Sequence, residues 1–244
     1  MAAVTLLETK GLTKTFGGLQ ANTDIDFTLT QGDVMALIGP NGAGKSTFVG
    51  MLCGRIPATR GQVFFKGEDI SALPAHKRIA LGIAYTFQIT SIFANLAVRE
   101  NVALAARRKG DIAEAVVQAR VASVLMRVGL FDRANQTAGD LSYGHQRVLE
   151  IAMGLVQEPE LFILDEPTQG LSDAEITEFV SLITGLRGAT TILLIEHNMD
   201  VVMRSAQSIT VLNSGEILAS GTPQEIQANP AVQQAYLGTV DAAG

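Results

Sequence analysis

A glycine-rich loop at residues 39 to 47 constrains the fold of this chain more than any other sequence feature. It directly follows the apolar run VMALI at 34 to 38 and leads into a helical pattern at 46 to 53. Glycines here let successive backbone N–H groups turn toward phosphate oxygens, and the helix start adds a positive partial charge. This order predicts a phosphate-binding loop rather than a turn that only joins two elements. The loop residues are Gly39, Pro40, Asn41, Gly42, Ala43, Gly44, Lys45, Ser46 and Thr47.

Two side chains of the loop and two acids at a later strand end are the candidate hydrolytic groups. We expect Lys45 to reach the β- and γ-phosphates and Ser46 to ligate Mg²⁺. Asp165 and Glu166 end a strand pattern, where neighbouring side chains point to opposite sides. Asp165 is therefore predicted to hold Mg²⁺ through its water shell, and Glu166 to orient and deprotonate the attacking water. The alternative is that these acids only cap the next helix.

Alternating strand and helix patterns predict a mostly parallel sheet in an α/β fold. Strands are expected at 34 to 38, 160 to 164 and 190 to 195, and helices at 46 to 53 and 142 to 157. In sheets of this type, ligands bind beyond the carboxyl ends of the strands. Gln88 follows the strand pattern IAYTF, and His197 follows the strand at 190 to 195, so both are predicted to lie near the γ-phosphate.

Three regions depart from this alternation. The first 30 residues predict antiparallel strands, added at an edge, around a turn at Gly17 and Gly18, and residues 209 to 219 predict a hairpin. From 95 to 157 helical patterns replace strand signals, so we expect a helical subdomain inserted between the core segments 1 to 94 and 158 to 244. Ser142 and Gly144 in this insert predict a second anion-binding helix start, and an ordinary helix cap at Ser142 is the alternative.

Composition excludes several classes of protein. The 244 residues include 18 Lys and Arg against 24 Asp and Glu, and the net charge of −6 disfavours nucleic-acid binding through phosphate contacts. Cys53 is the single cysteine, so neither an intramolecular disulfide nor a cysteine-based zinc site is expected. The first residues lack an export-signal pattern, and no apolar run approaches the ~18 residues of a membrane span. We therefore expect a soluble globular domain.

Five segments in this order resemble the nucleotide-binding subunit of ABC transporters over nearly all of residues 4 to 238. They are GPNGAGKST, Gln88, LSYGH at 141 to 145, LFILDE at 161 to 166 and His197. The resemblance implies a single domain over 1 to 244 with the P-loop NTPase fold, a RecA-like core, an antiparallel β edge and the inserted helical subdomain. It also implies an ATPase that uses ATP and Mg²⁺, with Lys45, Glu166 and His197 as catalytic residues.

Further roles follow from the same resemblance. Phe16 matches the position whose ring stacks on adenine, and Gln88 matches a glutamine that contacts the metal. Ser142 and Gly144 would complete the phosphate site of a second ATP-binding subunit, identical or homologous, in a head-to-tail dimer. Residues 88 to 96 would form the groove for two membrane permease subunits; the alternative for this segment is core packing of the insert.

Within the family, the chain is most similar to the ATP-binding subunits of branched-chain amino acid importers. This similarity rests on LTKTFGGLQA, LEIA, IEHNMD and NPAVQQAYLG. It implies a peripheral subunit at the cytoplasmic face of the inner membrane, linked through its permeases to a periplasmic solute-binding protein. The alternatives are import of urea or another small solute, a soluble ABC ATPase without a transport role, and a nucleotide sensor without turnover.

Two positions depart from the family signature. Tyr143 replaces a glycine and His145 replaces a glutamine, which predicts weaker contacts from this segment to nucleotide. The acids at Asp165 and Glu166 are intact, so the hydrolytic pair is expected to function.

Overall fold

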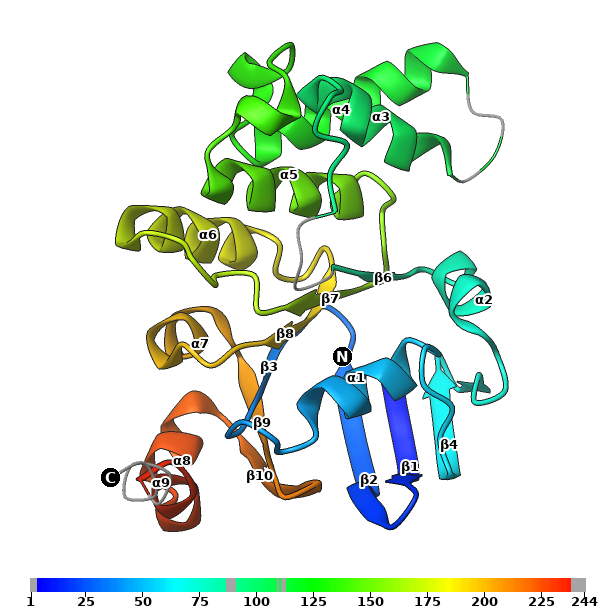
Figure 1. Cartoon of the computed structure of the whole chain (residues 1–244), viewed down its shortest axis with the longest axis vertical. Helices are drawn as coiled ribbons and strands as arrows, with labels where there is room; N and C mark the ends of the chain where they lie inside the picture. Colours follow the sequence, from blue (N-terminus) through cyan, green and yellow to red (C-terminus); the bar gives the residue numbers. More distant parts are fainter. Residues whose placement is uncertain (1–3, 87–90, 109, 111–112, 238–244) are drawn as a thin grey trace.

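A six-stranded sheet forms the centre of the computed structural model, which describes residues 4–86, 91–108, 110 and 113–237 (Figure 1). Across the sheet the strands are β10 (Glu216–Gly221), β9 (Ser208–Asn213), β3 (Val34–Ile38), β8 (Thr191–Ile195), β7 (Leu161–Asp165) and β6 (Ile83–Tyr85). Neighbours pair in parallel, except that β10 runs antiparallel to β9. The predicted parallel sheet and the predicted carboxy-terminal hairpin are therefore confirmed.

The central strands β3, β7 and β8 are buried at every position because both faces of the sheet are covered. Successive side chains of a strand point to opposite faces. In β8, Leu193 packs in a cluster with helix α1 (Lys45–Leu52), whereas Ile192 packs in a cluster with α6 (Asp173–Gly185). A strand buried in this way has a nearly continuous apolar sequence, as residues 192–195 of β8 do.

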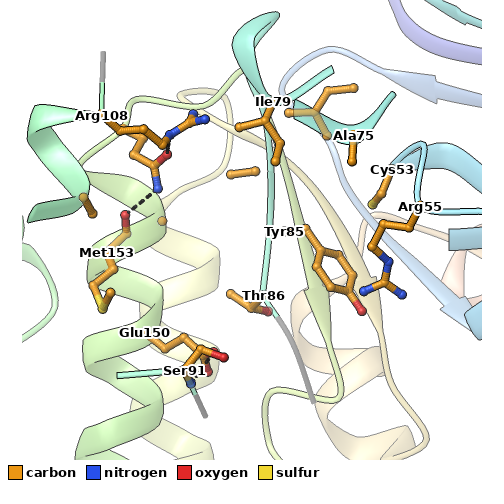
Figure 2. Close-up of a pocket in the computed structure, with 15 residues that line it drawn as sticks. Cys53, Arg55, Ala75, Ile79, Tyr85, Thr86, Ser91, Arg108, Glu150 and Met153 are labelled. Carbon is orange, nitrogen blue, oxygen red and sulfur yellow. Dashed lines mark hydrogen bonds between the residues drawn. The ribbon is translucent and has the colours of Figure 1, made fainter. Parts of the chain in front are cut away.

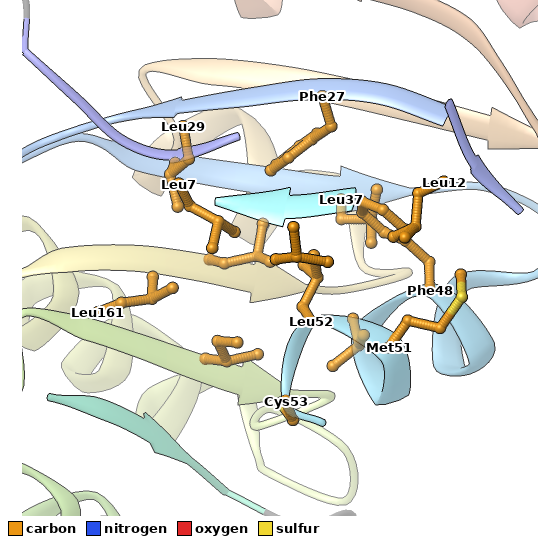
Figure 3. Close-up of a cluster of buried hydrophobic side chains, with 14 of the residues drawn as sticks. Leu7, Leu12, Phe27, Leu29, Leu37, Phe48, Met51, Leu52, Cys53 and Leu161 are labelled. Carbon is orange, nitrogen blue, oxygen red and sulfur yellow. The ribbon is translucent and has the colours of Figure 1, made fainter. Parts of the chain in front are cut away.

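A second, antiparallel sheet covers α1 from the other side. It contains, in order, β2 (Leu19–Thr30), β1 (Thr5–Phe16), β4 (Arg60–Phe65) and β5 (Glu68–Asp69). Figure 3 shows Leu7, Phe27 and Phe48 in the cluster that joins this sheet to α1, with the two phenylalanine rings edge to face at 5.3 Å. The first 30 residues are thus antiparallel as expected. They form a separate sheet, and do not extend the parallel one, because their apolar faces pack on α1.

Between β6 and β7 the described residues form helices and short 3-10 turns. These elements are α3 (Val98–Arg107), α4 (Glu114–Arg127), the turns Phe131–Arg133 and Ala138–Asp140, and α5 (Tyr143–Leu155). They enclose an apolar cluster of their own and lie together at one end of the molecule (Figure 1). The subdomain boundaries at 95 and 157 stay a prediction. No helix within the described ranges is both long and apolar enough to cross a bilayer.

Three helices pack near the start of the glycine-rich loop. They are α7 (Met199–Ser205), α8 (Pro223–Ala228) and α9 (Pro230–Leu237). Ile226 of α8 and Val232 of α9 share a cluster with Ile38, the last residue of β3. The carboxy-terminal segment therefore packs against the strand that leads into the loop.

A buried arginine closes the carboxyl end of α1. Arg78 lies on α2 (Ala75–Ala80) and is 3% exposed. Its guanidinium donates to the carbonyls of Met51 and Leu52 at 2.8 Å each and to two carbonyls of the segment 71–73 at 2.9 Å. The last carbonyls of a helix lack partners within the helix, so Arg78 satisfies this end of α1 and ties it to the chain before α2.

Replacing Arg78 with alanine is expected to lower the free energy of unfolding by about 3 kcal/mol, because buried carbonyls lose a charged donor. Arg78→Lys should recover only part of the loss, since an ammonium lacks the planar fork of the guanidinium. Urea unfolding of the full chain measures both changes. The control is Lys77→Ala at an exposed position of the same helix, and an equal effect of the two alanine variants would contradict the role of Arg78.

Candidate active site

The glycine-rich loop adopts a backbone conformation that requires glycine at both ends. Gly39 and Gly44 have φ values of 151° and 95°, which residues with a Cβ rarely adopt. A Cβ on Gly39 would collide with the carbonyl oxygen of Leu212 in β9, and a Cβ on Gly44 would collide with that of Ala21 in β2. Backbone from both sheets therefore holds the loop closely, and only glycine fits at these contacts.

Lys45 begins α1 and folds its side chain back over the loop. Its ammonium donates to the carbonyls of Gly39 at 2.6 Å and Pro40 at 3.1 Å, and the residue is 9% exposed. Burial lowers the pKa of Lys45, while the nearby carboxylates of Glu166 and Asp165 act in the opposite direction. The ammonium thus contacts the loop and is attracted by the two acids at the end of β7.

Asp165 ends β7 as a buried carboxyl group beside a tyrosine hydroxyl. Tyr85, on the neighbouring strand β6, donates to Oδ2 of Asp165 at 2.6 Å. Burial raises the pKa of Asp165, and the hydrogen bond from Tyr85 counteracts this rise because it favours the charged carboxylate. Burial also raises the pKa of the Tyr85 phenol, which therefore remains a donor. The sequence pattern does not reveal this role of Tyr85, because only the pairing of β6 with β7 brings the two side chains together.

Glu166 and His197 line one cavity together with the start of the loop. The cavity has a volume of about 480 Å³ and is bounded by Gly39, Pro40, Asn41, Glu166, Gln169, His197 and Tyr236. The backbone N–H of Glu166 donates to the carbonyl of Ile195 at 2.9 Å, and its φ is 47°. A positive φ strains the backbone of a non-glycine residue by on the order of 1–3 kcal/mol. Residues strained in this way cluster at functional sites.

A buried glutamate joins the two chain segments that carry these residues. Glu196 is 0% exposed. Its Oε1 accepts hydrogen bonds from the N–H of Thr168 at 3.1 Å and from the hydroxyl of the same residue at 2.6 Å. Its Oε2 accepts from the N–H groups of His197 at 3.1 Å and Asn198 at 3.3 Å. Glu196 therefore fixes the chain just after Glu166 to the backbone of His197, and sequence reading misses it because it resembles one more acid at a strand end.

The helix start at Ser142 lies outside the cavity at the glycine-rich loop. Ser142 caps α5 by accepting from the N–H of His145 at 3.3 Å, and its hydroxyl lies 2.7 Å from Nδ1 of the same histidine. The carboxylate of Glu175, in the first turn of α6, lies so close to Gly144 that a Cβ there would collide with it. Neither Ser142 nor Gly144 belongs to the described residues that line the cavity at the loop.

The other predicted residues are not among the described residues that line the cavity at the loop. Phe16 ends β1 and is 48% exposed, and the centre of its ring lies 4.8 Å from the ammonium of Lys14. Gln88 lies outside the described residues. Ser46 is exposed in the first turn of α1, and its hydroxyl and the carboxylate of Asp165 are the hard oxygen donors that suit Mg²⁺. Within the described ranges, no cluster of three or more His, Cys, Asp or Glu side chains could hold a metal ion.

Comparison with known proteins covers nearly the whole chain. Residues 22–169 match the family model for ABC transporters, and residues 216–242 match the model for branched-chain amino acid ATP-binding cassette transporters. The high-affinity branched-chain amino acid transport ATP-binding protein LivG of Escherichia coli (strain K12) is 39% identical over 96% of this chain and 98% of its own length. BraF of Pseudomonas aeruginosa, which has the same description, matches with the same identity and coverage.

The fold is shared with a solved structure. The ADP conformation of MJ1267, an ATP-binding cassette of an ABC transporter, matches with a TM-score of 0.88 and 27% identity over 96% of this chain and 99% of that chain. The predicted P-loop NTPase fold is therefore confirmed.

Tyr85→Phe is expected to move the acidic limb of the pH–rate profile to higher pH. In the native protein the tyrosine hydroxyl holds the pKa of Asp165 below the value that burial alone would set. Without it the carboxylate takes up a proton at higher pH, and the protonated form is a poor ligand for a cation. The pH dependence of kcat/KM for nucleotide hydrolysis measures the shift. An unchanged acidic limb in a folded variant would contradict this role of Tyr85.

Proposed function

This chain belongs to the ABC transporter family and is an ATPase subunit, and from this membership we propose that it powers the import of branched-chain amino acids or of a related small solute. The observation that carries the proposal is the 39% identity, over 96% of the chain, to LivG and BraF, both high-affinity branched-chain amino acid transport ATP-binding proteins. The match of residues 216–242 to the branched-chain amino acid model supports the same class of solute.

In the proposed cycle, the glycine-rich loop and Lys45 hold the phosphates of ATP. Backbone N–H groups of the loop and the start of α1 bind phosphate oxygens. The Lys45 ammonium exchanges the carbonyls of Gly39 and Pro40 for oxygens of the β- and γ-phosphates. Ser46 and Asp165 would hold Mg²⁺, which would neutralise charge on these phosphates. Tyr85 supports this because its hydrogen bond favours the charged form of Asp165.

Glu166 is proposed as the general base. It faces the cavity at the start of the loop, where it can orient a water molecule for in-line attack on the γ-phosphorus. The bond to the bridging oxygen of ADP breaks as the water oxygen bonds to phosphorus, and the water proton passes to Glu166. His197 lines the same cavity and is proposed to contact the γ-phosphate, while Glu196 holds the segments of both residues in place.

A second ATP-binding subunit, identical or homologous, is proposed to complete the site. Ser142 and Gly144 form a helix start rich in N–H donors, outside the cavity of their own chain. In a head-to-tail pair this helix start would meet the γ-phosphate bound to the partner, so that ATP joins the subunits and hydrolysis separates them. The Glu175 carboxylate beside Gly144 must then withdraw, because two anions repel each other at one helix start.

We assign the contact with two membrane permease subunits to the groove beside β6 and α5. Figure 2 shows this cavity of about 320 Å³, with Ile79 and Tyr85 on one wall and Met153 on the other. Ser91, from the segment predicted to receive the permeases, also lines it, and its N–H donates to Glu150 on α5 at 3.2 Å. Residues 88–90 of that segment lie outside the described residues.

Phe93 is an exposed apolar side chain on a rigid backbone, as a docking contact requires. The residue is 55% exposed. Asn101, buried in α3, accepts from the N–H of Phe93 at 2.7 Å and donates to its carbonyl at 3.1 Å. The proposed docking places the subunit at the cytoplasmic face of the inner membrane as a peripheral protein, linked through the permeases to a periplasmic solute-binding protein.

Glu166→Gln is expected to bind ATP but to hydrolyse it at least ~100-fold more slowly, because an amide cannot take the water proton. In cells whose own gene is deleted, the wild-type chain should restore uptake of radiolabelled leucine and the variant should not. Glu178→Gln, at an exposed position of α6, is the matched control. Equal hydrolysis rates for wild type and Glu166→Gln would contradict the role of Glu166 as general base. If the wild-type chain restored uptake of urea but not of leucine, the transported solute would be urea and not a branched-chain amino acid.

Phe93→Asp is expected to abolish co-purification of the chain with its permease subunits while ATP binding persists, because a charge replaces the apolar contact at the docking surface. Phe131→Asp, which alters another exposed phenylalanine outside the predicted segment, should leave the complex intact. If Phe93→Asp still co-purified with the permease subunits, docking at this segment would be contradicted.

A further inference from the structure

Tyr143, the first residue of α5, makes two contacts that the sequence does not reveal. Its ring lies against Gly170, where an added Cβ would come within 3.0 Å of Cε1 of the tyrosine. The Cζ atom of Arg147, one turn further along α5, lies 5.5 Å from the centre of the same ring. Although Tyr143 is 45% exposed, its ring therefore joins the start of α5 to the chain segment that follows Glu166.

We propose that Tyr143 is a positioning residue of the ATPase reaction, which transmits the position of α5 to the segment that carries Glu166. The proposal rests on the function described above, because it requires Glu166 to be the general base. Tyr143 is not among the described residues that line the cavity at the loop. Within its own chain it therefore acts through Gly170 and not on the reacting atoms.

Two successive turns connect Gly170 to Glu166. The N–H of Gln169 donates to the carbonyl of Glu166 at 3.2 Å, and the N–H of Leu171 donates to the carbonyl of Thr168 at 3.1 Å. Gln169 also lines the cavity together with Glu166. A shift of Gly170 would therefore displace the turns that set the position of Glu166. Such a displacement matters for catalysis, because misplacement of a reacting group by about 1 Å can cost about 100-fold in rate.

The contact at Gly170 transmits movement because it joins a ring directly to backbone. Gly170 has a φ of 79° and no Cβ, so no flexible side chain lies between its backbone and the Tyr143 ring. Thr168, two residues before Gly170, is held by Glu196 through both its N–H and its hydroxyl. A movement of the ring toward Gly170 must therefore be taken up by the short stretch of backbone next to Thr168.

The other end of this connection reaches the groove assigned to the permeases. Arg147 is 3% exposed and donates to Oε2 of Glu150 at 3.0 Å. Oε1 of Glu150 accepts from the N–H of Ser91 at 3.2 Å, and both of these residues line the groove (Figure 2). Burial raises the pKa of Glu150, while the hydrogen bonds from Ser91 and Arg147 oppose the rise because they favour the carboxylate. The groove is thus joined through α5 to the Tyr143 ring.

Tyr143→Ala tests the proposal because it removes the ring from an exposed position. In the full chain assembled with its permeases and second ATP-binding subunit, kcat for ATP hydrolysis should fall about threefold to tenfold, within the usual range of coupling through such contacts. Binding of a fluorescent ATP analogue to the full chain alone should stay unchanged. Tyr143→Phe keeps the ring and should restore most of the rate. Phe131→Ala, at another exposed aromatic position, is the control for rate and melting temperature.

A double-mutant cycle with Gly170→Ala locates the effect of Tyr143. The added methyl group would press on the tyrosine ring, so Gly170→Ala should lower kcat when the ring is present. In the Tyr143→Ala background, the reduction should be smaller by a factor of about three or more. The strain of alanine at a positive φ is the same in both backgrounds and cancels in this comparison.

Three results would overturn the inference. One is an unchanged kcat in Tyr143→Ala. Another is a double variant whose two reductions simply multiply, which would show that Tyr143 acts elsewhere, for example on the nucleotide of the partner subunit. The third is a fall in kcat with an equal loss of ATP binding and a lower melting temperature, which would show a purely structural role. Equal hydrolysis by wild type and Glu166→Gln would instead refute the proposed function, so the two failures are distinguishable.

Discussion

The close packing of backbone around the glycine-rich loop is the constraint on which the rest of the structure depends. A Cβ at Gly39 would meet β9 of one sheet, and a Cβ at Gly44 would meet β2 of the other. A phosphate site of this kind binds through backbone N–H groups, so its affinity depends on the path of the chain more than on side-chain identity. The two sheets and α1 together set that path, so the geometry of the short loop depends on both sheets.

Each buried carboxylate among the described residues accepts a hydrogen bond from a donor that the fold supplies. Tyr85 donates to Asp165, Thr168 and the backbone of His197 donate to Glu196, and Arg147 donates to Glu150 at 3.0 Å. A buried acid without such donors would be protonated or would destabilise the fold. The pairs of Tyr85 with Asp165 and of Thr168 with Glu196 also link segments that are distant in sequence, so they serve both the charge state of the site and its geometry.

Local sequence predicts the parts of this architecture that local chemistry determines. The loop at 39–47, the apolar strands and the pair Asp165 and Glu166 can be read directly, because glycine spacing and apolar runs report backbone geometry. The roles of Tyr85 and Glu196 cannot, since each depends on a partner that only the folding of the chain brings near. The separate antiparallel sheet is missed for the same reason: it exists because β1 pairs with β4, some 50 residues away.

The helix that follows the loop is only eight residues long. Helices shorter than ~12–15 residues are marginal in water, so α1 and the partial charge at its start exist only while both sheets enclose it. Nucleotide binding and folding are therefore thermodynamically linked in this chain. An unfolded or partly folded chain lacks the phosphate site, so nucleotide binds only the folded state and stabilises it.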